Sequence, residues 1–585
     1  MRRAFCFARA CPALDKGIMT ISPLGDSAVV IVLGENVDPA IAARVRAIAL
    51  EIERHPPNGV VDVVPAFASV AVFFDPARAA AFDVMRLELE ALIARANAAV
   101  GAVEIRTIEI PVRYGGESGP DLATVAAHTK LSASDVIALH EGGDYLVHAI
   151  GFAPGFPYLG GLPPELATPR RATPRPRVPA GSVGIGGIQT GVYSLATPGG
   201  WNLIGCTPLR LFDAARPAPA LLHAGDRVKF RAISASEFAG LESECHVLRD
   251  TPPGTSGVQR DEKCHVIRDT MPGIEVVRAG MFTTVQDLGR VGHRAQGVPL
   301  SGAADPFALR LANLLVGNPE HAAGIEFTLI GPELKFLHDT VVAFGGADFG
   351  GLPRWRPIKI EAGTVLKLGA ARTGCRGYLA VAGGIDVTPV LGSRSTYVSG
   401  GLGGWAGRVL RDGDFLPVRV IRHDIQGRWR IDERILPKYA ESPMVRVIRG
   451  ANAEQFDREW ISKSFQVSPQ SDRMGVRLTG DPILRNTRDD LVSSPVTPGT
   501  VQVPPDGRPI VLLADAQTIG GYPQLAQVIS VDLPLVAQLR PHDSVRFREV
   551  TLDEARGLAL SRERAVGLLR EGLAQKISGD APAYP

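Results

Sequence analysis

The stretch YLVHAIGFAPGFPYLGGLP (residues 145–163) decides the fold of the region around it. A short apolar run is followed by a loop rich in Gly and Pro, and the same alternation continues to Arg231. Since Gly and Pro interrupt regular elements at turns, this pattern predicts short strands separated by turns. Such strands are typical of a β-barrel or a β-sandwich.

The residues before this region alternate between strand and helix patterns. The expected elements, in chain order, are a strand at 27–33, a helix at 39–53, strands at 60–64 and 69–74, a helix at 79–99 and a strand at 106–112. This β-α-β-β-α-β order predicts a ferredoxin-like domain. Two short helical segments are expected between Pro120 and His140.

A polar segment at 237–273 changes the character of the chain and is predicted to be a linker. It carries the near-duplicates ECHVLRDTPPG and KCHVIRDTMPG, but adjacent Cys-His pairs lack the usual ligand spacing of structural zinc sites, so no metal site is expected. Beyond it the chain is mostly β, with a helix at 306–316 and helical periodicity at 552–576.

The chain of 585 residues exceeds what one hydrophobic core organises, so several domains are expected. The fold class predicted is α+β and mainly β. The predicted segments are a ferredoxin-like domain at 20–112, a β-barrel at 113–236, the linker at 237–273, a β-rich barrel domain at 274–440, a second β-rich domain at 441–550 and a helical tail at 551–585.

The composition is that of a globular protein, with 45% hydrophobic and 21% charged residues. Lys and Arg (63) balance Asp and Glu (61), so nucleic acid is not an expected partner. No apolar run reaches the roughly 20 residues of a membrane helix.

Six Cys are scattered along the chain, and this usage predicts free thiols and a cytoplasmic location. Arg9 and Asp15 interrupt any signal-peptide core, so a disordered extension is expected before Met19, an alternative start.

The loop GFAPGFPYLGGLP (151–163) is a candidate wall for a cavity that takes a flat substrate. The alternative is a barrel turn with buried aromatic side chains, since aromatic clusters usually belong to a core. The following segment PRRATPRPRVPAGSVGIGGIQTG combines arginines with a Gly-rich stretch, which can offer cations and backbone N–H groups to an anion. It is not a Walker-type phosphate loop, because no Gly-Lys-Ser/Thr follows.

Polar residues also stand at the ends of elements in the second half. Asp305 directly precedes Pro306 and is predicted to cap the helix that follows. Asp472, Arg473, Asp515, Gln517 and Tyr522 lie at predicted strand ends, where barrel-mouth sites are built. The alternative for the neighbouring Asp-Arg pair is a surface ion pair of little energetic weight.

These segments together resemble the allophanate hydrolase subunit 1 and subunit 2 families, also known as 5-oxoprolinase subunits B and C, in one fused chain. The first half is similar through GFAPGFPYLGGLP, PRRATPRPRVPAGSVGIGGIQTGVY and TPGGWNLIG. The second half is similar through TTVQDLGR, GAADPFALRLANLLVGN, YLAVAGGIDV, LGSRST, SDRMGVRL and ADAQTIGGYPQLA. The resemblance implies cyclophilin-like β-barrels after the ferredoxin-like domain.

The resemblance also implies three possible functions. We expect the amide-processing part of an ATP-dependent 5-oxoprolinase, which opens 5-oxoproline to glutamate. One alternative is a biotin-dependent carboxyltransferase acting on urea or a related amide, as in urea amidolyase. The other is a non-catalytic protein similar to a kinase inhibitor.

The partners and cofactors follow from these alternatives. A 5-oxoprolinase would work with a LamB/YcsF-type subunit, with ATP and Mg bound in the assembled complex and not clearly by this chain alone. A carboxyltransferase would need a biotin carboxylase and a biotinyl carrier. A small amide is the expected substrate, no membrane association is expected, and a homo-oligomer is possible.

The candidate site residues combine the patterns above with the resemblance. The catalytic candidates are Asp305, Asp472, Arg473, Asp515 and Gln517, and the substrate-binding candidates are Phe152, Phe156, Tyr158, Arg177, Ser182, Gln189, Trp201, Arg394 and Tyr522. No acid, base or nucleophile is assigned among them. The chain departs from the family pattern at Cys206, where an Arg is usual, and a thiol cannot replace its planar donors.

We expect the aromatic loop of the first barrel and the acidic strand ends of the second half to face one shared cleft.

Overall fold

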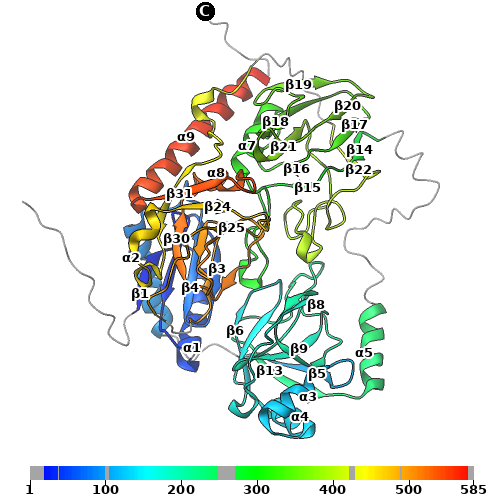
Figure 1. Cartoon of the computed structure of the whole chain (residues 1–585), viewed down its shortest axis with the longest axis vertical. Helices are drawn as coiled ribbons and strands as arrows, with labels where there is room; N and C mark the ends of the chain where they lie inside the picture. The colour runs from blue at the N-terminus through cyan, green and yellow to red at the C-terminus, as the bar shows by residue number, and fades with distance from the viewer. Residues whose placement is uncertain are drawn as a thin grey trace, which may run out of the picture.

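The computed structural model describes residues 19–36, 38–98, 105–247, 271–420, 429–487 and 491–577. Figure 1 shows several β-rich units and a long C-terminal helix that runs along one side of them. The residues before Met19, the Cys264-His265 pair and the end of the predicted tail lie outside the described ranges.

The N-terminal unit is a sheet of four antiparallel strands in the order β1-β2-β4-β3. Its elements are β1 (Thr20–Pro23), β2 (Ala28–Val32), α1 (Pro39–Arg54), β3 (Val60–Pro65), β4 (Ser69–Phe74) and α2 (Phe82–Ala98). Asp38 caps α1 by accepting a hydrogen bond from the Ala40 N–H at 2.7 Å. Apolar residues of both helices share one core cluster with the sheet.

The closing strand of this sheet differs from the prediction. The strand expected at 106–112 is β5 (Thr107–Tyr114), which belongs to the next barrel, and β1 takes the edge beside β2 instead. The turn between β1 and β2 is short, so this hairpin forms locally, whereas β5 pairs with a strand more than a hundred residues away.

The first barrel closes with seven strands. They are β5, β6 (Tyr145–Ile150), β7 (Pro157–Gly160), β9 (Ser182–Gly186), β10 (Gln189–Val192), β12 (Asn202–Cys206) and β13 (Arg227–Ala232). The parallel pair β5 and β13 joins the first and last strands. The two predicted helices are confirmed as α3 (Leu122–Thr129) and α4 (Ala133–Gly142). Outside the barrel, β8 (Arg175–Val178) and β11 (Thr197–Gly199) form a two-stranded ribbon.

The predicted linker begins as a helix, α5 (Ala235–Val247). After it comes a sandwich, where the sequence predicted a barrel. Its strands are β14 (Gly273–Arg278), β15 (Phe282–Gln286), β16 (Gly324–Thr328), β17 (Glu333–Phe336), β18 (Thr340–Asp348), β19 (Pro357–Ile360), β20 (Val365–Lys367), β21 (Thr373–Val381) and β22 (Phe415–Pro417).

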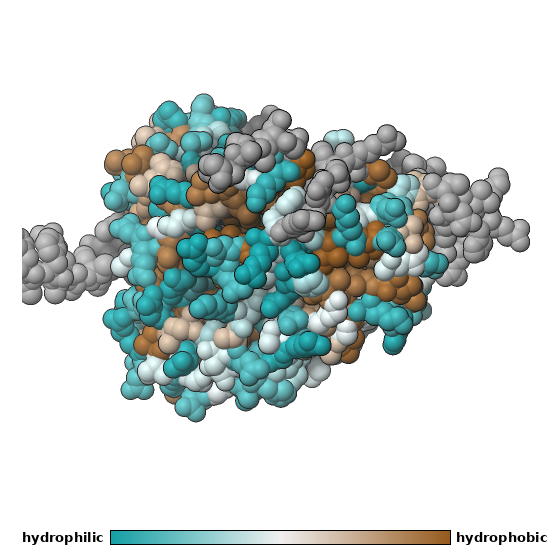
Figure 2. All heavy atoms as spheres, turned by 90° about the horizontal axis from the view of Figure 1, so that it is seen from above, coloured by the Kyte–Doolittle hydropathy of each residue, from teal (hydrophilic) through white to brown (hydrophobic). Residues whose placement is uncertain are grey.

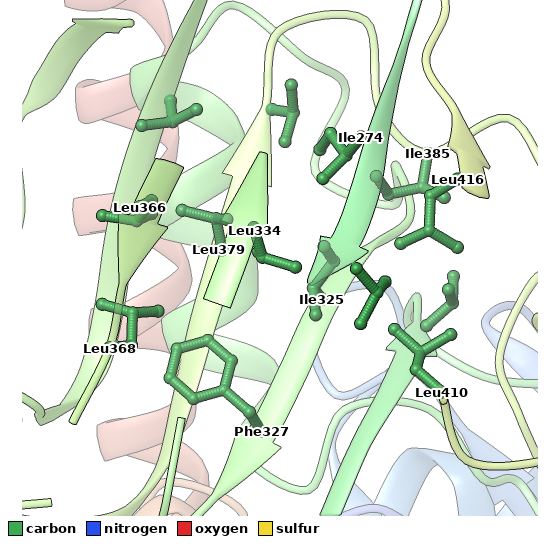
Figure 3. Packing of buried hydrophobic residues seen from close by; sticks show 14 of the residues in the cluster. Ile274, Ile325, Phe327, Leu334, Leu366, Leu368, Leu379, Ile385, Leu410 and Leu416 are labelled. Carbon is green, nitrogen blue, oxygen red and sulfur yellow. The ribbon is translucent and has the colours of Figure 1, made fainter. Parts of the chain in front are cut away.

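The sandwich consists of a four-stranded and a five-stranded sheet. Figure 3 shows Ile274 and Leu334 of the first sheet beside Ile325, Phe327 and Leu379 of the second. Alternating apolar residues on each sheet fill the space between them, so neither sheet needs to close on itself.

The helix predicted at 306–316 is confirmed as α7 (Pro306–Leu315). Asp305 caps it, as predicted, by accepting a hydrogen bond from the Ala308 N–H at 3.0 Å.

A second seven-stranded barrel follows, in the same cyclic strand order as the first. Its strands are β23 (Met444–Arg449), β24 (Ser464–Val467), β25 (Gly475–Thr479), β27 (Thr500–Gln502), β28 (Ile510–Leu512), β30 (Gln524–Val528) and β31 (Ser544–Glu549). The first and last strands, β23 and β31, again pair in parallel. A ribbon of β26 (Ser494–Pro495) and β29 (Ile519–Gly520) stands where the first barrel has β8 and β11. The two barrels therefore share one topology.

The short helix α8 (Leu533–Ala537) precedes β31, and α9 (Leu552–Ile577) ends the described chain. The prediction of a C-terminal helix is confirmed. Arg310 of α7 forms two hydrogen bonds with the Glu563 carboxylate, at 2.7 and 2.6 Å, which ties α9 to the sandwich. Short 3-10 helices complete the fold: η1 (Pro164–Leu166), η2 (Arg294–Gln296), η3 (Val398–Gly400), η4 (Glu433–Ile435), η5 (Ala453–Gln455) and η6 (Arg458–Ser462).

The N-terminal sheet packs between distant parts of the chain. In Figure 1 it lies beside the second barrel, and the Ser530 hydroxyl donates to Asp26 at 2.7 Å across this contact. A mixed apolar cluster, which includes Phe67, Ala149 and Ile519, joins the sheet to both barrels. The units therefore form one continuous body.

The face in Figure 2 is mostly hydrophilic, with hydrophobic residues exposed in patches between the polar ones. None of the helices in the described ranges combines the length and the apolar character that crossing a bilayer requires. The predicted fold class, α+β and mainly β with two barrels of the kind that the family has, is confirmed.

A buried histidine makes the first barrel sensitive to pH. His140 is fully buried, with Nδ1 at 2.8 Å from the Tyr114 hydroxyl and Nε2 at 3.0 Å from Thr190 Oγ1. Burial lowers the pKa of His140 to about 3, from an ordinary value of 6.5. Between these values the unfolded chain binds a proton that the folded barrel excludes, so stability falls as the pH falls below about 6.5.

We expect His140→Gln, which does not titrate, to remove part of this pH dependence. The wild-type free energy of unfolding should fall by about 1 kcal/mol more than that of the variant between about pH 7.5 and pH 5.5. Urea unfolding at both pH values measures the difference. Equal pH dependence in the two proteins would contradict the assignment.

Candidate functional site

A pocket of about 290 Å³ opens on the first barrel, and we call it the aromatic pocket. It lies between the loop after β6 and the ribbon of β8 and β11. Its lining residues are Phe152, Phe156, Tyr158, Arg170, Arg171, Pro174, Tyr193, Pro198, Gly199, Gly200 and Trp201.

Phe156 is the centre of the aromatic wall. Its ring centroid lies 5.2 Å from Tyr158, 5.4 Å from Tyr193 and 5.7 Å from Trp201, each time edge to face. Phe156, Tyr193 and Trp201 are buried, whereas Phe152 is 38% exposed at the rim. Both alternatives from the sequence therefore hold in part: most rings belong to a core, and that core forms one wall of a cavity.

The Gly-rich segment after the ribbon strand β8 makes room for Trp201. A Cβ on Gly186 would lie 2.4 Å from the indole Cδ1, and a Cβ on Gly191 would lie 3.0 Å from its Cζ3. Since real Cβ atoms do not approach other atoms so closely, these positions of β9 and β10 need glycine.

Phe152 adopts a left-handed backbone conformation with φ of +66°. Its loop is fixed by hydrogen bonds from the Gly151 N–H to the Phe156 carbonyl at 3.0 Å and from the Phe156 N–H to the Ala153 carbonyl at 3.0 Å. A bulky residue in this region is strained, and such strain often marks ligand-binding loops. The loop thus presents one exposed aromatic ring at the rim of the pocket.

The second half of the chain supports this loop from behind. The Gly155 N–H donates to the Gln296 carbonyl at 2.8 Å, and a Cβ on Gly297 would lie 2.5 Å from the Ala153 carbonyl oxygen. A Cβ on Gly151 would lie 2.8 Å from Ile519 of the second barrel. The position of the loop therefore depends on all three contacts.

Asp121 fixes the arginines beside the pocket. Its Oδ1 accepts hydrogen bonds from Arg175 at 2.8 Å and Arg171 at 3.2 Å, and its Oδ2 accepts one from the Leu203 N–H at 2.7 Å. Burial raises the pKa of Asp121, but these hydrogen bonds and the arginine charges outweigh it and hold the pKa below its usual value. Asp121 is therefore ionised and holds the ribbon segment in place.

Arg170 is the exposed cation of the pocket. Within the described ranges it forms no ion pair, and its charge acts on Tyr158 and Tyr193. Burial raises the pKa of Tyr158 to about 12, so its hydroxyl is protonated at neutral pH. The pocket thus combines flat apolar walls with a cation and a neutral phenol.

The other substrate-binding candidates of the first half lie elsewhere. Arg177 lines a separate cavity of about 440 Å³ together with Ser399 and Gly400. Ser182 is buried on β9 opposite Cys206, and Gln189 stands on β10; neither lines the aromatic pocket.

Arg473 and Asp515 meet inside the junction between the sandwich and the second barrel. Arg473 Nε donates to Asp515 at 2.9 Å, its Nη1 donates to Glu326 of β16, and the Ser301 hydroxyl donates to Asp515 at 2.9 Å. Burial lowers the pKa of Arg473, but the two carboxylates outweigh it and raise the pKa above the ordinary value. These opposite charges satisfy one another.

Asp305 and Asp472 both act on backbone N–H groups. Asp305 is fully buried and, besides capping α7, accepts hydrogen bonds from Tyr439 at 2.7 Å and Gln538 at 3.0 Å. Burial raises the pKa of Asp305. Asp472 is exposed and closes a turn by accepting from the Met474 N–H at 2.8 Å.

The remaining candidates of the second half are dispersed. Arg394 donates to the Val387 carbonyl at 2.8 Å, Gln517 is partly buried, and Tyr522 is 46% exposed. None of them lines the aromatic pocket.

The expectation of one shared cleft is therefore wrong. The lining of the aromatic pocket comes from the first barrel alone, and Arg473 and Asp515 point into a packed junction because buried opposite charges pair with each other. The catalytic roles of the second-half residues stay predictions.

The prediction of the site missed Tyr193 and Asp121. Tyr193 ends the Gly-rich segment, where an isolated aromatic residue gives little signal. Asp121 stands before a helical segment, which indicates a cap. Its contacts with arginines 50 and 54 residues away could not be inferred from that position.

Two family descriptions match the chain. The "Carboxyltransferase domain, subdomain C and D" family matches residues 19–222, and the "Carboxyltransferase domain, subdomain A and B" family matches residues 296–549. Together they cover the first barrel with its N-terminal sheet, most of the sandwich and the second barrel.

Similar curated proteins match one half of the chain each. The C-type 5-oxoprolinase protein of Escherichia coli is 42% identical over 294 residues, covering 48% of this chain and 93% of that protein. The B-type 5-oxoprolinase protein of Bacillus subtilis is 45% identical over 233 residues, covering 38% of this chain and 97% of that protein. The urea amidolyase of Lachancea kluyveri is 33% identical over 53% of this chain, but only 19% of that protein is covered.

A solved structure matches both halves in one arrangement. The crystal structure of TTHA0988 superposes with a TM-score of 0.75 at 35% identity, covering 89% of this chain and 99% of that one. The arrangement of the two halves thus recurs outside this chain.

We expect the strain at Phe152 to appear in stability measurements. Phe152→Gly and Phe152→Ala both remove the ring, but only Ala keeps a Cβ at positive φ. Phe152→Gly should therefore be more stable than Phe152→Ala by about 1 kcal/mol. Urea unfolding of the two variants tests this, and an alanine variant as stable as the glycine variant would contradict it.

Proposed function

The chain belongs to the family of 5-oxoprolinase subunits B and C and carries both types in one polypeptide; from this premise we propose that it is the amide-processing component of an ATP-dependent 5-oxoprolinase. The proposed reaction converts 5-oxoproline, ATP and water to glutamate, ADP and phosphate.

The observation that carries this proposal is the composition of the aromatic pocket. 5-Oxoproline is a flat five-membered lactam with one carboxylate. Phe152 and Phe156 offer apolar faces to such a ring, and Arg170 offers an exposed guanidinium to its carboxylate. The volume of about 290 Å³ suits a small ligand.

The pocket also offers a hydrogen-bond donor to the lactam carbonyl. The Tyr158 hydroxyl stays protonated, because burial raises its pKa to about 12. A donor in a water-poor site polarises a carbonyl more strongly than water does. Tyr158 is thus proposed to orient and polarise the amide that ATP-dependent chemistry activates.

We assign ATP and Mg to the assembled complex with a LamB/YcsF-type subunit. A pocket of about 290 Å³ is small for a nucleotide, and the described ranges contain no group of three side chains suited to hold a metal ion. When bound, ATP supplies the phosphoryl group that activates the amide; this chain holds the lactam. Use of ATP agrees with the cytoplasmic location that we propose.

We expect Arg170→Gln to raise KM for 5-oxoproline by about tenfold or more, because it removes a charge-assisted hydrogen bond to the carboxylate. The assay mixes the chain with its partner subunit and ATP and follows glutamate release. Arg564→Gln, at an exposed position of α9, is the matched control and should leave KM unchanged. An unchanged KM in Arg170→Gln would remove Arg170 from the site.

A second candidate function is biotin-dependent carboxyl transfer to urea or a related amide. The carboxyltransferase descriptions and the likeness to urea amidolyase favour it. It would require a biotin carboxylase and a biotinyl carrier as partners.

The two functions differ in their products and partners. With a LamB/YcsF-type subunit and ATP, we expect glutamate release from 5-oxoproline. With a biotin carboxylase, its loaded carrier, ATP and bicarbonate, we expect no carboxylation of urea. The opposite pair of results would replace the first function by the second.

A further inference from the structure

A second pocket, of about 460 Å³, lies between α1 of the N-terminal unit and the first barrel. We call it the α1 pocket. It shares no lining residue with the aromatic pocket, although β7 contributes Gly160 to one and Tyr158 to the other. Its size is within the usual range for small-molecule sites.

Small residues on both sides make this space. Ala42, Ala43 and Ala47 form the helix side, and Gly160 and Gly161 lie on the barrel side. A Cβ on Gly160 would lie 2.2 Å from His148 Nε2, and a Cβ on Gly161 would lie 2.2 Å from the Asp144 carbonyl oxygen. The sequence therefore keeps the pocket open with residues that cannot fill it.

His148 lines the α1 pocket with unused hydrogen-bonding capacity. The residue is 6% exposed, and its Nδ1 is buried without a hydrogen-bond partner among the described residues. Its ring stacks on Phe67 with centroids 5.3 Å apart and planes at 15°, which fixes its orientation. Burial lowers the pKa of His148 to about 4, so at neutral pH the ring is an uncharged donor and acceptor.

The charged groups of the lining favour an anion. Arg46 and Arg227 contribute two guanidinium groups, against one carboxylate from Asp144. That carboxylate is already shared between Arg227 at 3.3 Å and Lys229 at 3.6 Å. Arg46 reaches across the pocket from α1 and donates to the Gly225 carbonyl at 3.4 Å. The cations therefore exceed the carboxylate within the lining.

We propose that the α1 pocket binds a small organic carboxylate with an apolar body. The carboxylate pairs with the guanidinium groups of Arg46 and Arg227, whose planar geometry suits it. The apolar body lies between the alanines of α1 and Ile105, which is 46% exposed. The imidazole of His148 contributes a neutral hydrogen bond.

Calorimetry on the full chain tests this with three carboxylates, hexanoate, cyclohexanecarboxylate and benzoate, each against its neutral amide. We expect at least one carboxylate to bind saturably and its amide to bind roughly tenfold more weakly or worse. Binding by none of the three, or equal binding of acid and amide, overturns the proposal.

Variants on α1 locate the binding. Ala43→Phe should fill the pocket and abolish binding, whereas Ala40→Phe, at an exposed position of the same helix outside the lining, should leave it unchanged. Arg46→Gln keeps the pocket open and should weaken carboxylate binding about tenfold without affecting the amide. In nitrogen NMR the His148 ring signals should shift on binding. Wild-type affinity in both Ala43→Phe and Arg46→Gln would place the ligand elsewhere and overturn the proposal.

Discussion

The buried ion pair between Asp62 and Arg294 is the contact on which the arrangement of the molecule depends. Asp62 belongs to β3, Arg294 begins η2 after the sandwich strand β15, and their side chains lie 3.5 Å apart with almost no exposure. Burial raises the pKa of Asp62 and lowers that of Arg294, so each charge is costly without the other. The Gly292 N–H donates to the same carboxylate at 2.9 Å, and the guanidinium lies 4.3 Å from the centre of the Phe73 ring. This pair holds η2 in place, and η2 in turn accepts the hydrogen bond from Gly155 that sets the rim of the aromatic pocket.

The two barrels show how one topology serves two purposes. In the first barrel the outer ribbon stands apart and leaves space against the loop that carries Phe152. In the second barrel the equivalent ribbon contributes Ile519, which packs against Gly151 and joins a shared apolar cluster. The same element thus opens a pocket in one barrel and supports that pocket from the other. The charged residues of the second half pair within its junctions, which explains why they add rigidity and do not line the pocket.

Local patterns predicted much of the fold, and long-range pairings were the part they missed. The helix after Asp305 and its cap were predictable because both depend on neighbouring residues. The strand at 107–114 was placed in the wrong sheet because its partner, β13, begins more than a hundred residues later. For the site, the aromatic loop was recognisable from composition. The burial of Arg473 between Asp515 and Glu326 was not, since a neighbouring Asp-Arg pair in sequence gives no sign of which carboxylate the guanidinium meets.

Both halves of this molecule belong to one polypeptide, whereas the 5-oxoprolinase subunits that they match are each covered almost completely by one half. The contacts of Asp62 with Arg294 and of Gly155 with Gln296 are therefore intramolecular here. Tethered surfaces meet at an effective concentration that does not fall on dilution. The pocket rim should consequently keep its shape at any protein concentration, and the ratio of the two halves is fixed by translation and not by the balance of two separate gene products.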